Sequence, residues 1–344
     1  MASPRRIAIA GFGFMGSMHA QVYAQLPDAQ LIAVADANPA AARAKLGRLK
    51  FDIPVYSTLG ELLERHPETD AADVCTPLDC HEADALCALD AGKHLFCEKP
   101  LAPSLEAADR ILARAAATKA IAQVGHCIRF WPEYQALRAL FNGGSAGRLQ
   151  SLCLTRRAGR PAYSDGDWLN KAGRSGGAAL DLHIHDTDFV LALLGGPASV
   201  TSRATVDYSG PSHIFTLYDY PGTAVQSEGG WNYPAQWGFS MAYQALFERA
   251  VVDFESNRNP TLTITWQDRA PEPLAFAAPR SRQSAGGEGN ISSLGGYFNE
   301  LESFVACLVA GRHPKDATLA DARASLAVAL AEIESARTGR TIIL

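Results

Sequence analysis

The sequence predicts a two-domain α/β protein: a doubly wound parallel sheet comes first, and an α/β domain with a large, mostly antiparallel open sheet follows. The chain has 344 residues, which is enough for two domains that each bury a core. Its first third alternates short β-branched runs with longer helical patterns, as strand-helix-strand units do. After about residue 125 the β-rich runs follow one another between Gly, Pro and Asn, which indicates antiparallel strands. We therefore expect domains at 1–125 and 126–344.

The first domain is expected to contain six strands and five helices. The expected strands occupy residues 6–10, 31–35, a short piece near Val55, 72–75, 94–97 and 121–125. The expected helices occupy residues 15–24, 39–49, 59–65, 81–90 and 105–117. Several of these helices open on Ser, Thr or Pro, which helix starts prefer.

The second domain is expected to mix helices with antiparallel strands. Helices are expected at 132–141, from near Leu180, at 294–309 and at 319–338. Strands are expected at 149–155, 200–207, 213–220, 223–231, 262–267 and 341–344. The patterns do not decide which domain the last two helices pack against.

Composition and charge narrow the class of protein. Hydrophobic residues make up 47% of the chain and charged residues 19%, as in an ordinary globular enzyme. No apolar run approaches the roughly 20 residues that span a bilayer, so we expect no membrane partner. The net charge of −5 disfavours nucleic acid, because a mildly acidic surface repels phosphate backbones. The seven cysteines show neither disulfide nor zinc-ribbon spacing, which favours a reducing cytoplasm.

A glycine-rich turn follows the first expected strand. Gly11, Gly13 and Gly16 stand where a dinucleotide-binding loop needs a tight turn, close approach to a pyrophosphate, and close packing of helix on sheet. The next helix would offer unpaired N–H groups and its positive dipole end to the phosphates. The structural alternative is a plain tight turn. The whole candidate loop consists of Gly11, Phe12, Gly13, Phe14, Met15 and Gly16.

An acidic residue at the end of the second expected strand supports the dinucleotide prediction. Asp36 lies about twenty positions after Gly16, where a carboxylate can accept hydrogen bonds from the adenosine ribose hydroxyls. Its charge would repel a 2′-phosphate, so the sequence favours NAD over NADP. Arg43 or Lys45 could moderate that repulsion.

Two further strand ends carry candidate site residues. Thr76, Pro77 and then His81 follow one strand, in a loop that can border a cofactor or be an ordinary proline turn. Glu98 and Lys99 follow the next strand, which places an ammonium at the carboxyl end of the sheet, where doubly wound folds bind ligands. Beside an oxidised nicotinamide, this lysine could hydrogen-bond to a substrate hydroxyl or take its proton. The alternative for Lys99 is a solvated surface side chain.

A segment in the second half combines carboxylates with histidines. On an α-helix, Asp181, His185 and Asp188 fall at i, i+4 and i+7 and share one face. The carboxylate can orient the imidazole and favour its charged form, which makes His185 a candidate base. His183 and His185 point about 200° apart on a helix and could chelate together only if this segment were a strand, so we expect no metal. A packing or supporting role is the default for His183.

Taken together, the motifs resemble the Gfo/Idh/MocA oxidoreductases, a family named for glucose-fructose oxidoreductase and inositol dehydrogenase. The likeness spans essentially the whole chain. The residues that carry it are the glycine loop with His19-Ala20, Cys75-Thr76-Pro77 with His81, Glu98-Lys99-Pro100, Gly125-His126-Cys127-Ile128-Arg129-Phe130, the 181–188 segment, and Tyr297, Glu300-Leu301 and Phe304.

The resemblance implies a Rossmann domain, an α/β domain whose open sheet often mediates dimers or tetramers, and a catalytic set around a sugar or cyclitol hydroxyl. By position, the catalytic residues are Lys99, Asp181 and His185. The resemblance also places His126, Arg129 and Trp168 near the substrate. The cofactor set that it implies is the 11–16 loop, Asp36, Thr76, Pro77, His81, Glu98 and Lys99.

The chain departs from the family pattern at two positions. His183 stands where many members have glycine, and Cys127 stands where many have asparagine. The substrate contacts implied by the resemblance therefore rest on a weaker match than the catalytic set does. Aromatic side chains of the second half suit either sugar stacking or a core or subunit interface; they are Tyr163, Trp168, Trp231, Tyr233 and Trp237.

The expected reaction is NAD-dependent oxidation of a secondary hydroxyl in a pyranose, glycoside or inositol. His185 or Lys99 would take the hydroxyl proton, hydride would pass to C4 of NAD, and Asp181 would orient the base. Both bases stay candidates, because coupled groups titrate as a pair. Carbonyl reduction is the same chemistry in reverse. Two other classes remain open: a glycosidase that retains NAD and works by transient oxidation, and a non-catalytic dinucleotide-sensing regulator.

Overall fold

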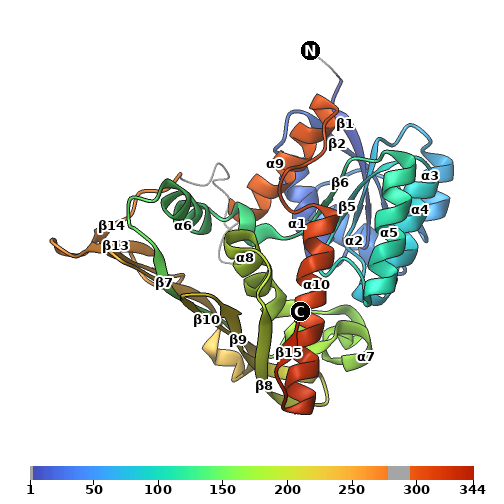
Figure 1. The fold of residues 1–344 in the computed structure, drawn as a ribbon. Helices are drawn as coiled ribbons and strands as arrows, with labels where there is room; N and C mark the ends of the chain where they lie inside the picture. The colour runs from blue at the N-terminus through green and yellow to red at the C-terminus, as the bar shows by residue number, and fades with distance from the viewer. Residues whose placement is uncertain (1–2, 278–294) are drawn as a thin grey trace. The chain divides into compact units, whose positions relative to one another are not determined.

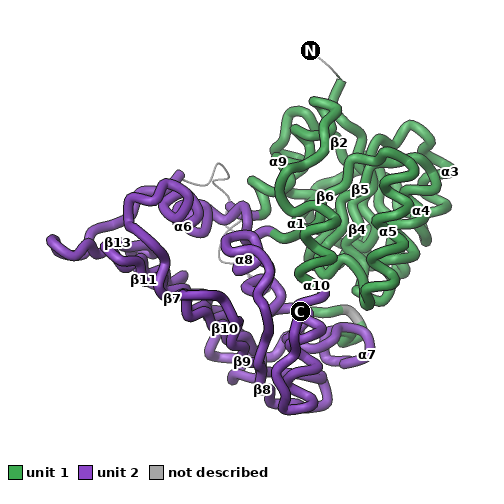
Figure 2. Tube along the Cα trace, in the orientation of Figure 1, with its two compact units in different colours: residues 1–126, 163–168, 297–326 green, residues 127–162, 169–296, 327–344 purple. Residues whose placement is uncertain are grey.

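The structure is a computed structural model that describes residues 3–277 and 295–344. The chain folds into two compact units, which Figure 2 shows in two colours. The first unit contains residues 1–126, 163–168 and 297–326, and the second contains 127–162, 169–296 and 327–344. The helix α10 (Leu319–Thr338) contributes residues to both.

The first unit is built on a six-stranded parallel sheet with the strand order β3-β2-β1-β4-β5-β6 (Figure 1). The order reverses beside β1, so the predicted doubly wound sheet is confirmed. The strands are β1 (Arg5–Ala10), β2 (Ala29–Ala35), β3 (Val55–Tyr56), β4 (Ala71–Val74), β5 (His94–Cys97) and β6 (Ala122–Val124). The helices are α1 (Phe14–Tyr23), α2 (Pro39–Leu49), α3 (Leu59–Arg65), α4 (His81–Asp90) and α5 (Leu105–Thr118).

Helix starts in this unit follow the capping signals of the sequence. The side chains of Asn38, Thr58 and Ser104 accept hydrogen bonds from backbone N–H groups in the first turns of α2, α3 and α5. Each cap satisfies one donor that the helix itself leaves unpaired. These caps explain why the predicted starts of the three helices agree with the structure.

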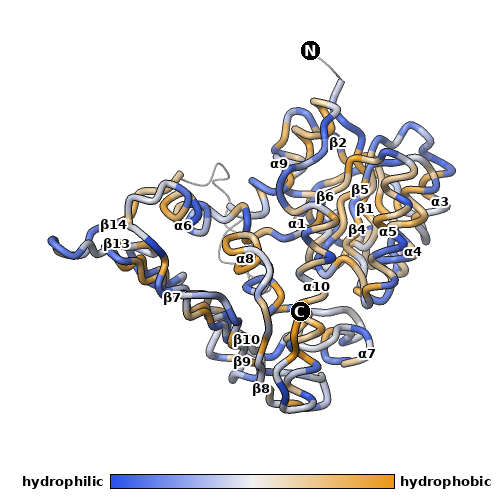
Figure 3. Tube along the Cα trace, in the orientation of Figure 1, coloured by the Kyte–Doolittle hydropathy of each residue, from blue (hydrophilic) through white to orange (hydrophobic). Residues whose placement is uncertain are grey.

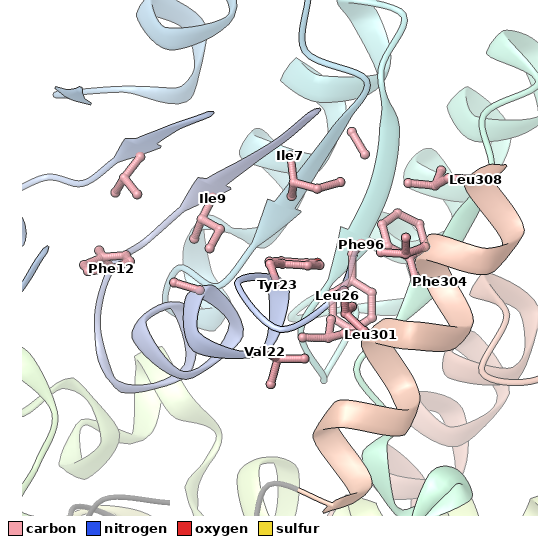
Figure 4. Packing of buried hydrophobic residues seen from close by; sticks show 14 of the residues in the cluster. Ile7, Ile9, Phe12, Val22, Tyr23, Leu26, Phe96, Leu301, Phe304 and Leu308 are labelled. Carbon is pink, nitrogen blue, oxygen red and sulfur yellow. The ribbon is translucent and has the colours of Figure 1, made fainter. Parts of the chain in front are cut away.

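A late helix completes the core of the first unit. From Tyr297 onward, α9 (Gly295–Ala310) belongs to this unit and packs on the sheet. The rings of Phe304 and Phe96 meet edge to face with centroids 5.5 Å apart, and Leu301 is fully buried in the same cluster (Figure 4). Apolar residues concentrate on the central strands of the sheet (Figure 3). Side-chain packing thus assigns α9 to the parallel sheet, which its sequence pattern left open.

The second unit is built on a nine-stranded sheet with the order β14-β13-β12-β11-β7-β10-β9-β8-β15. Among the described strands of this sheet, only the β7–β10 pair is parallel, so the predicted mostly antiparallel sheet is confirmed. The strands are β7 (Leu149–Gly159), β8 (Ser199–Asp207), β9 (Gly210–Tyr220), β10 (Thr223–Tyr233), β11 (Phe239–Phe247), β12 (Ala250–Glu255), β13 (Leu262–Trp266), β14 (Glu272–Pro273) and β15 (Ile342–Ile343).

The sequence interpretation did not include β11 and β12. Residues 239–247 contain Met, Ala, Gln and Leu, which are good helix formers, so composition hides the strand. The pairing of β11 with β7 on one side and β12 on the other makes it a central strand. Tertiary context overrides local propensity here, as it often does in sheets.

One face of this sheet is covered and the other is open. The helices α6 (Pro132–Gly143) and α8 (Ile184–Leu194) pack on the covered face, where Tyr134 contacts Tyr243 and Phe254 (Figure 1). On the opposite face, Phe215 and Leu217 of β9 are 53% and 59% exposed. Among the described residues, no helix has both the length and the apolar character that crossing a bilayer requires.

Candidate functional site

The glycine loop lies between β1 and α1 and touches the loop that follows β4. Gly11 has φ +86°, and a Cβ there would lie 2.7 Å from the backbone of Cys75 and Thr76. A Cβ on Gly16 would lie 2.0 Å from the Gly11 carbonyl oxygen. Only glycine fits these two positions, because one needs a left-handed backbone and both leave no room for a side chain. A Cβ on Gly13 would meet nothing within 4 Å, and no side chain caps α1.

Asp36 is tied directly to the glycine loop. Its Oδ2 accepts a hydrogen bond of 2.7 Å from the Phe12 N–H, and its Oδ1 accepts one of 2.7 Å from the Asn38 N–H. The loop and the second strand end are therefore locked together in the geometry of a dinucleotide site. Arg43, a candidate to offset the Asp36 charge, donates instead to the Val55 carbonyl at 3.2 Å.

His81 joins two of the predicted cofactor loops. Its Nδ1 lies 2.7 Å from the Pro100 carbonyl oxygen, and its Nε2 lies 2.8 Å from the Thr76 carbonyl oxygen. Burial lowers the pKa of His81, although the two carbonyl contacts oppose that shift. The neutral ring has one N–H, so it donates to one of these two carbonyls, and the tautomer determines whether that is Thr76, after β4, or Pro100, after β5. Thr76 donates its hydroxyl to Asp84 at 2.8 Å.

Glu98 and Lys99 follow β5 at the carboxyl edge of the parallel sheet, where the sequence predicted them. Glu98 is 5% exposed, and its Oε2 accepts a hydrogen bond of 3.1 Å from the Lys99 N–H. A Cβ on Gly125 would lie 2.9 Å from the Glu98 carboxyl carbon, so the carboxylate is packed tightly against that glycine. The Lys99 residue is half-buried.

A buried polar cluster beneath these loops was not assigned a role from the sequence. The ligand atoms of His19, Asp73 and Cys75 all lie within 4.8 Å of one another, and the Tyr23 hydroxyl donates to Asp73 at 2.9 Å. His19 and Asp73 are 0% exposed. The sequence signal was present: Asp73 interrupts the otherwise apolar β4, and a carboxylate in a buried strand needs partners.

The segment that carries Asp181 and His185 does not form the regular helix that was predicted. Residues Ala179–His183 form a π-helix, and α8 begins only at Ile184. The spacing argument assumed an α-helix, and a π turn changes the rotation per residue, so the shared face of Asp181 with His185 and Asp188 stays a prediction. Single π turns occur frequently at functional sites. Asp181 is half-buried and His185 is 8% exposed.

Two buried arginine–aspartate pairs anchor α8. Arg129 binds both carboxylate oxygens of Asp188 at 2.7 and 2.8 Å. Arg156 of β7 binds both oxygens of Asp186 at 3.2 and 2.8 Å. Asp188 is therefore the ion-pair partner of Arg129. The sequence interpretation placed Arg129 beside the substrate and did not foresee these pairs.

His183 is part of a buried network in the second unit. Its Nε2 lies 3.3 Å from a Glu332 carboxylate oxygen and 3.2 Å from the Ser227 hydroxyl. Thr187 also contacts Glu332, at 3.0 Å. A Cβ on Gly229 would lie 2.7 Å from the His183 Nδ1, so a glycine in β10 makes room for the imidazole. The expected packing role for His183 agrees with these contacts.

The remaining predicted residues fall into separate environments. His126 is 1% exposed and belongs to the first unit, as does Trp168, which is half-buried in the 165–170 turn. The Phe14 ring of the glycine loop meets Tyr163 with centroids 5.4 Å apart. Trp231 is buried and donates to Ser209, whereas Trp237 is 54% exposed. Thus Tyr163 contacts the loop, and Trp231 belongs to the core.

The sheet order, the glycine loop and Asp36 together define a dinucleotide-binding protein of the doubly wound class. Comparison with known families identifies it further. Residues 5–126 match the model of the Gfo/Idh/MocA oxidoreductase family, described as an NAD-binding Rossmann fold, and residues 134–276 match the GFO/IDH/MocA C-terminal domain. The chain belongs to the Gfo/Idh/MocA oxidoreductases and is an enzyme of that family.

Individual relatives agree with this assignment. Inositol 2-dehydrogenase from Rhizobium meliloti (strain 1021) is 30% identical over 344 residues, with 98% of each chain covered. D-glucoside 3-dehydrogenase from Escherichia coli (strain K12) is 32% identical over 204 residues, which is 57% of this chain and 56% of that protein. The crystal structure of levoglucosan dehydrogenase with NADH and levoglucosan superposes with a TM-score of 0.82 at 20% identity, covering 99% of both chains, and shares the fold.

Proposed function

We propose that this enzyme oxidises a secondary hydroxyl of a sugar, glycoside or cyclitol with NAD as the hydride acceptor. The observation that carries the proposal is the placement of Lys99 at the carboxyl end of β5. The neighbouring backbone is in contact with two buried side chains: the Lys99 N–H donates to Glu98, and the Pro100 carbonyl oxygen lies 2.7 Å from the His81 Nδ1. The relatives that act on inositol and on D-glucoside support a polyhydroxylated ring as the substrate class.

The first unit fits the cofactor. A side chain at Gly11 or Gly16 would collide with backbone, so the loop keeps the close turn that a pyrophosphate requires. Asp36 has two carboxylate oxygens with further lone pairs for the ribose hydroxyls. Its negative charge favours NAD over NADP, because it would repel a 2′-phosphate. When bound, NAD supplies the acceptor for the hydride; the chain supplies binding and proton transfer.

The proton of the substrate hydroxyl is assigned to Lys99 or His185. Lys99 stands at the edge of the parallel sheet, and His185 stands in the first turn of α8, anchored by the two arginine pairs. Asp181 in the π turn is the carboxylate that orients and supports the base. His126, Arg129 and Trp168 remain the proposed substrate contacts.

The test is a panel of hexoses, glycosides and inositols with NAD, followed by NADH absorbance. We expect one class to be oxidised, and Lys99→Ala to lower kcat by roughly 100-fold or more, since general acid–base groups contribute about 10²–10⁴-fold. The matched control is Lys93→Ala, which removes a surface ammonium bonded to the Pro67 carbonyl. Full activity of Lys99→Ala would refute the assignment of the site.

The same panel separates the other two classes. A glycosidase that retains NAD would release free sugar from glycosides without net NADH. A dinucleotide-sensing regulator would bind NAD and turn over nothing. We favour a dehydrogenase over a sensor, because a protein that only binds NAD has little need for the ammonium of Lys99, the carboxylate of Asp181 and the imidazole of His185.

We further propose that the enzyme is a homodimer or homotetramer that acts in the cytoplasm. The support for assembly is the open sheet face, where Phe215 and Leu217 are more than half exposed. Large exposed apolar patches mark interaction surfaces. The cytoplasmic location rests on the number and spacing of the cysteines, all seven of which are free.

A further inference from the structure

We propose that Asp73, His19 and Glu98 form a buried carboxylate–imidazole–carboxylate chain that positions Lys99, so that His19 is a positioning residue for the reaction. The inference rests on the proposed function of Lys99. It concerns only side chains of the first unit, and the cluster lies below the strand ends rather than among the residues predicted to contact substrate.

The chain of contacts connects three elements. Asp73 is in β4, His19 is in α1, and Glu98 follows β5. The His19 Nδ1 lies 2.8 Å from an Asp73 oxygen, and the His19 Nε2 lies 3.2 Å from the Glu98 Oε1. The second contact is an ion pair whose N–H is not well aligned, and neither atom has a hydrogen bond to another described residue. Contacts in catalytic sites often tighten only in the complex with substrate.

The protonation state of His19 suits this arrangement. Burial opposes the imidazolium, but the charge of Asp73 and its hydrogen bond favour it, and the pKa of His19 is raised well above its usual value. An imidazolium has two N–H donors, one for each carboxylate, whereas a neutral ring has one. The other groups that face the ring are Tyr23, which donates to Asp73, and the apolar edge of Phe96.

A metal site is the competing explanation, since His19, Asp73 and Cys75 are close enough to share an ion. Metal binding requires a neutral imidazole and a thiolate. Without a metal, burial raises the pKa of Cys75 well above its usual value, and the charge of Asp73 raises it further. The Cys75 Sγ also lies 3.3 Å from Asp73, which accepts from it. The 2.8 Å between the His19 Nδ1 and the Asp73 Oδ2 is a direct hydrogen-bond distance, so the geometry favours hydrogen bonding among these side chains over a shared ion.

The carboxylate–imidazole–carboxylate chain is connected to Lys99 through the backbone N–H of Lys99. While Glu98 Oε1 faces His19, Glu98 Oε2 accepts the Lys99 N–H. A side chain at position 125 would collide with this carboxylate, so Gly125 leaves the space in which the Glu98 carboxylate lies. On the other side of Lys99, the Pro100 carbonyl oxygen lies 2.7 Å from the His81 Nδ1. Removing the His19–Glu98 contact would free the carboxylate to turn and would loosen the segment that carries the ammonium.

Two amide substitutions divide the roles of the two ring nitrogens. The amide nitrogen of His19→Asn is the same number of bonds from Cα as Nδ1, so this variant can keep the donor to Asp73 and loses the one to Glu98. The amide of His19→Gln reaches the Nε2 position, so it can keep the donor to Glu98. Tyr23→Phe is the matched control, because it removes a hydrogen bond to Asp73 from the same buried cluster and leaves Glu98 untouched.

The first measurement is hydrogen exchange of the Lys99 backbone amide by NMR, which needs no substrate. We expect His19→Asn to exchange this amide about 10-fold or more faster than the parent, and His19→Gln and Tyr23→Phe to stay close to it. The second measurement is turnover. We expect kcat to fall by roughly 10–100-fold in His19→Asn and less in His19→Gln, with the Kd for NAD changed by less than about 3-fold.

The outcomes distinguish this inference from the proposed function. If no substrate is turned over but the Lys99 amide is released in His19→Asn alone, the positioning holds and the reaction assigned to the site fails. The inference is overturned if His19→Asn and His19→Gln have the same Lys99 amide exchange rate and the same kcat. It is also overturned if Tyr23→Phe changes both quantities as much as they do, because His19 then has only a structural role. Stoichiometric zinc in the purified protein, with loss of kcat on chelation, would overturn it in favour of a metal site.

Discussion

At the scale of single residues, the proposed cofactor preference depends on one carboxylate. Asp36 holds the glycine loop through the Phe12 N–H, and we propose that its charge separates NAD from NADP. The sequence predicted the second role from spacing alone. The first role became visible only in the structure, because the hydrogen bond joins the ends of two different strands.

Substitution of Asp36 tests the cofactor assignment. Asp36→Asn keeps an oxygen that can accept the Phe12 N–H but removes the charge. We expect KM for NAD to rise about 10-fold, because hydrogen bonds to a charged group contribute ~1.5–3 kcal/mol, and the preference for NAD over NADP to shrink. Steady-state kinetics with both cofactors measures this. Asp28→Asn, at an exposed position after α1, is the control, and an unchanged NAD/NADP ratio in Asp36→Asn would contradict the prediction.

At the scale of elements, α8 is held by charge as well as by packing. The side chains of Arg156 and Asp186 are 2% and 0% exposed, and those of Arg129 and Asp188 are 4% and 1% exposed. Burial opposes the charged Arg156, yet the adjacent Asp186 raises the pKa of Arg156 above its usual value. The two pairs fix the rotation of α8, and therefore the direction of its first turn, where His185 is located.

Breaking one pair should cost much more than breaking a surface pair. We expect Asp186→Asn to lower the free energy of unfolding by ~3–5 kcal/mol, since it leaves a buried guanidinium without its countercharge. Arg337→Met, which removes an exposed i,i+3 pair with Glu334, should cost at most ~1 kcal/mol. Urea unfolding of both variants measures the difference. Equal losses in the two variants would show that the buried pair does not anchor α8.

At the scale of the whole molecule, one face of the nine-stranded sheet presents apolar side chains to solvent. Alternate residues of β9 point to opposite faces: Ile214, Thr216 and Tyr218 are buried, whereas Phe215 and Leu217 are exposed. These exposed apolar side chains support the proposal that copies of the chain pair through this face.

Oligomeric state tests this surface. We expect the parent to sediment as a dimer or tetramer, and Leu217→Lys to shift it toward the monomer, because a charge placed in an apolar interface is costly to bury. Analytical ultracentrifugation across a concentration series measures the shift. Asp219→Lys, two residues along the same face, is the comparison for charge alone. If the parent protein sediments as a monomer, the proposal of a homodimer or homotetramer is wrong.

Local signals made much of the fold predictable. The glycine loop, the capping residues Asn38, Thr58 and Ser104, and the alternation of strand and helix act over a few residues, so they are readable in the sequence. The positions of Asp36, Glu98 and Lys99 at strand ends followed from the same patterns, since parallel strands end at one edge of the sheet.

Other features depend on contacts between distant parts of the chain. The strand β11 forms because it pairs with β7, about ninety residues earlier, and α9 joins the parallel sheet because Phe304 packs on Phe96. The π turn at 179–183 breaks the helical spacing that relates Asp181 to His185 in an α-helix. None of these leaves a periodic trace in the sequence.

By itself, then, the sequence determined the doubly wound first half, its glycine loop and the residues at its strand ends, because short-range backbone preferences and hydrophobic periodicity encode them. The tertiary structure decided which charges are buried together: Asp73 with His19 and Glu98, Asp186 with Arg156, and Asp188 with Arg129. The physical reason is that a charge leaves water only where folding has brought a partner to it, and that partner is chosen in space rather than along the chain.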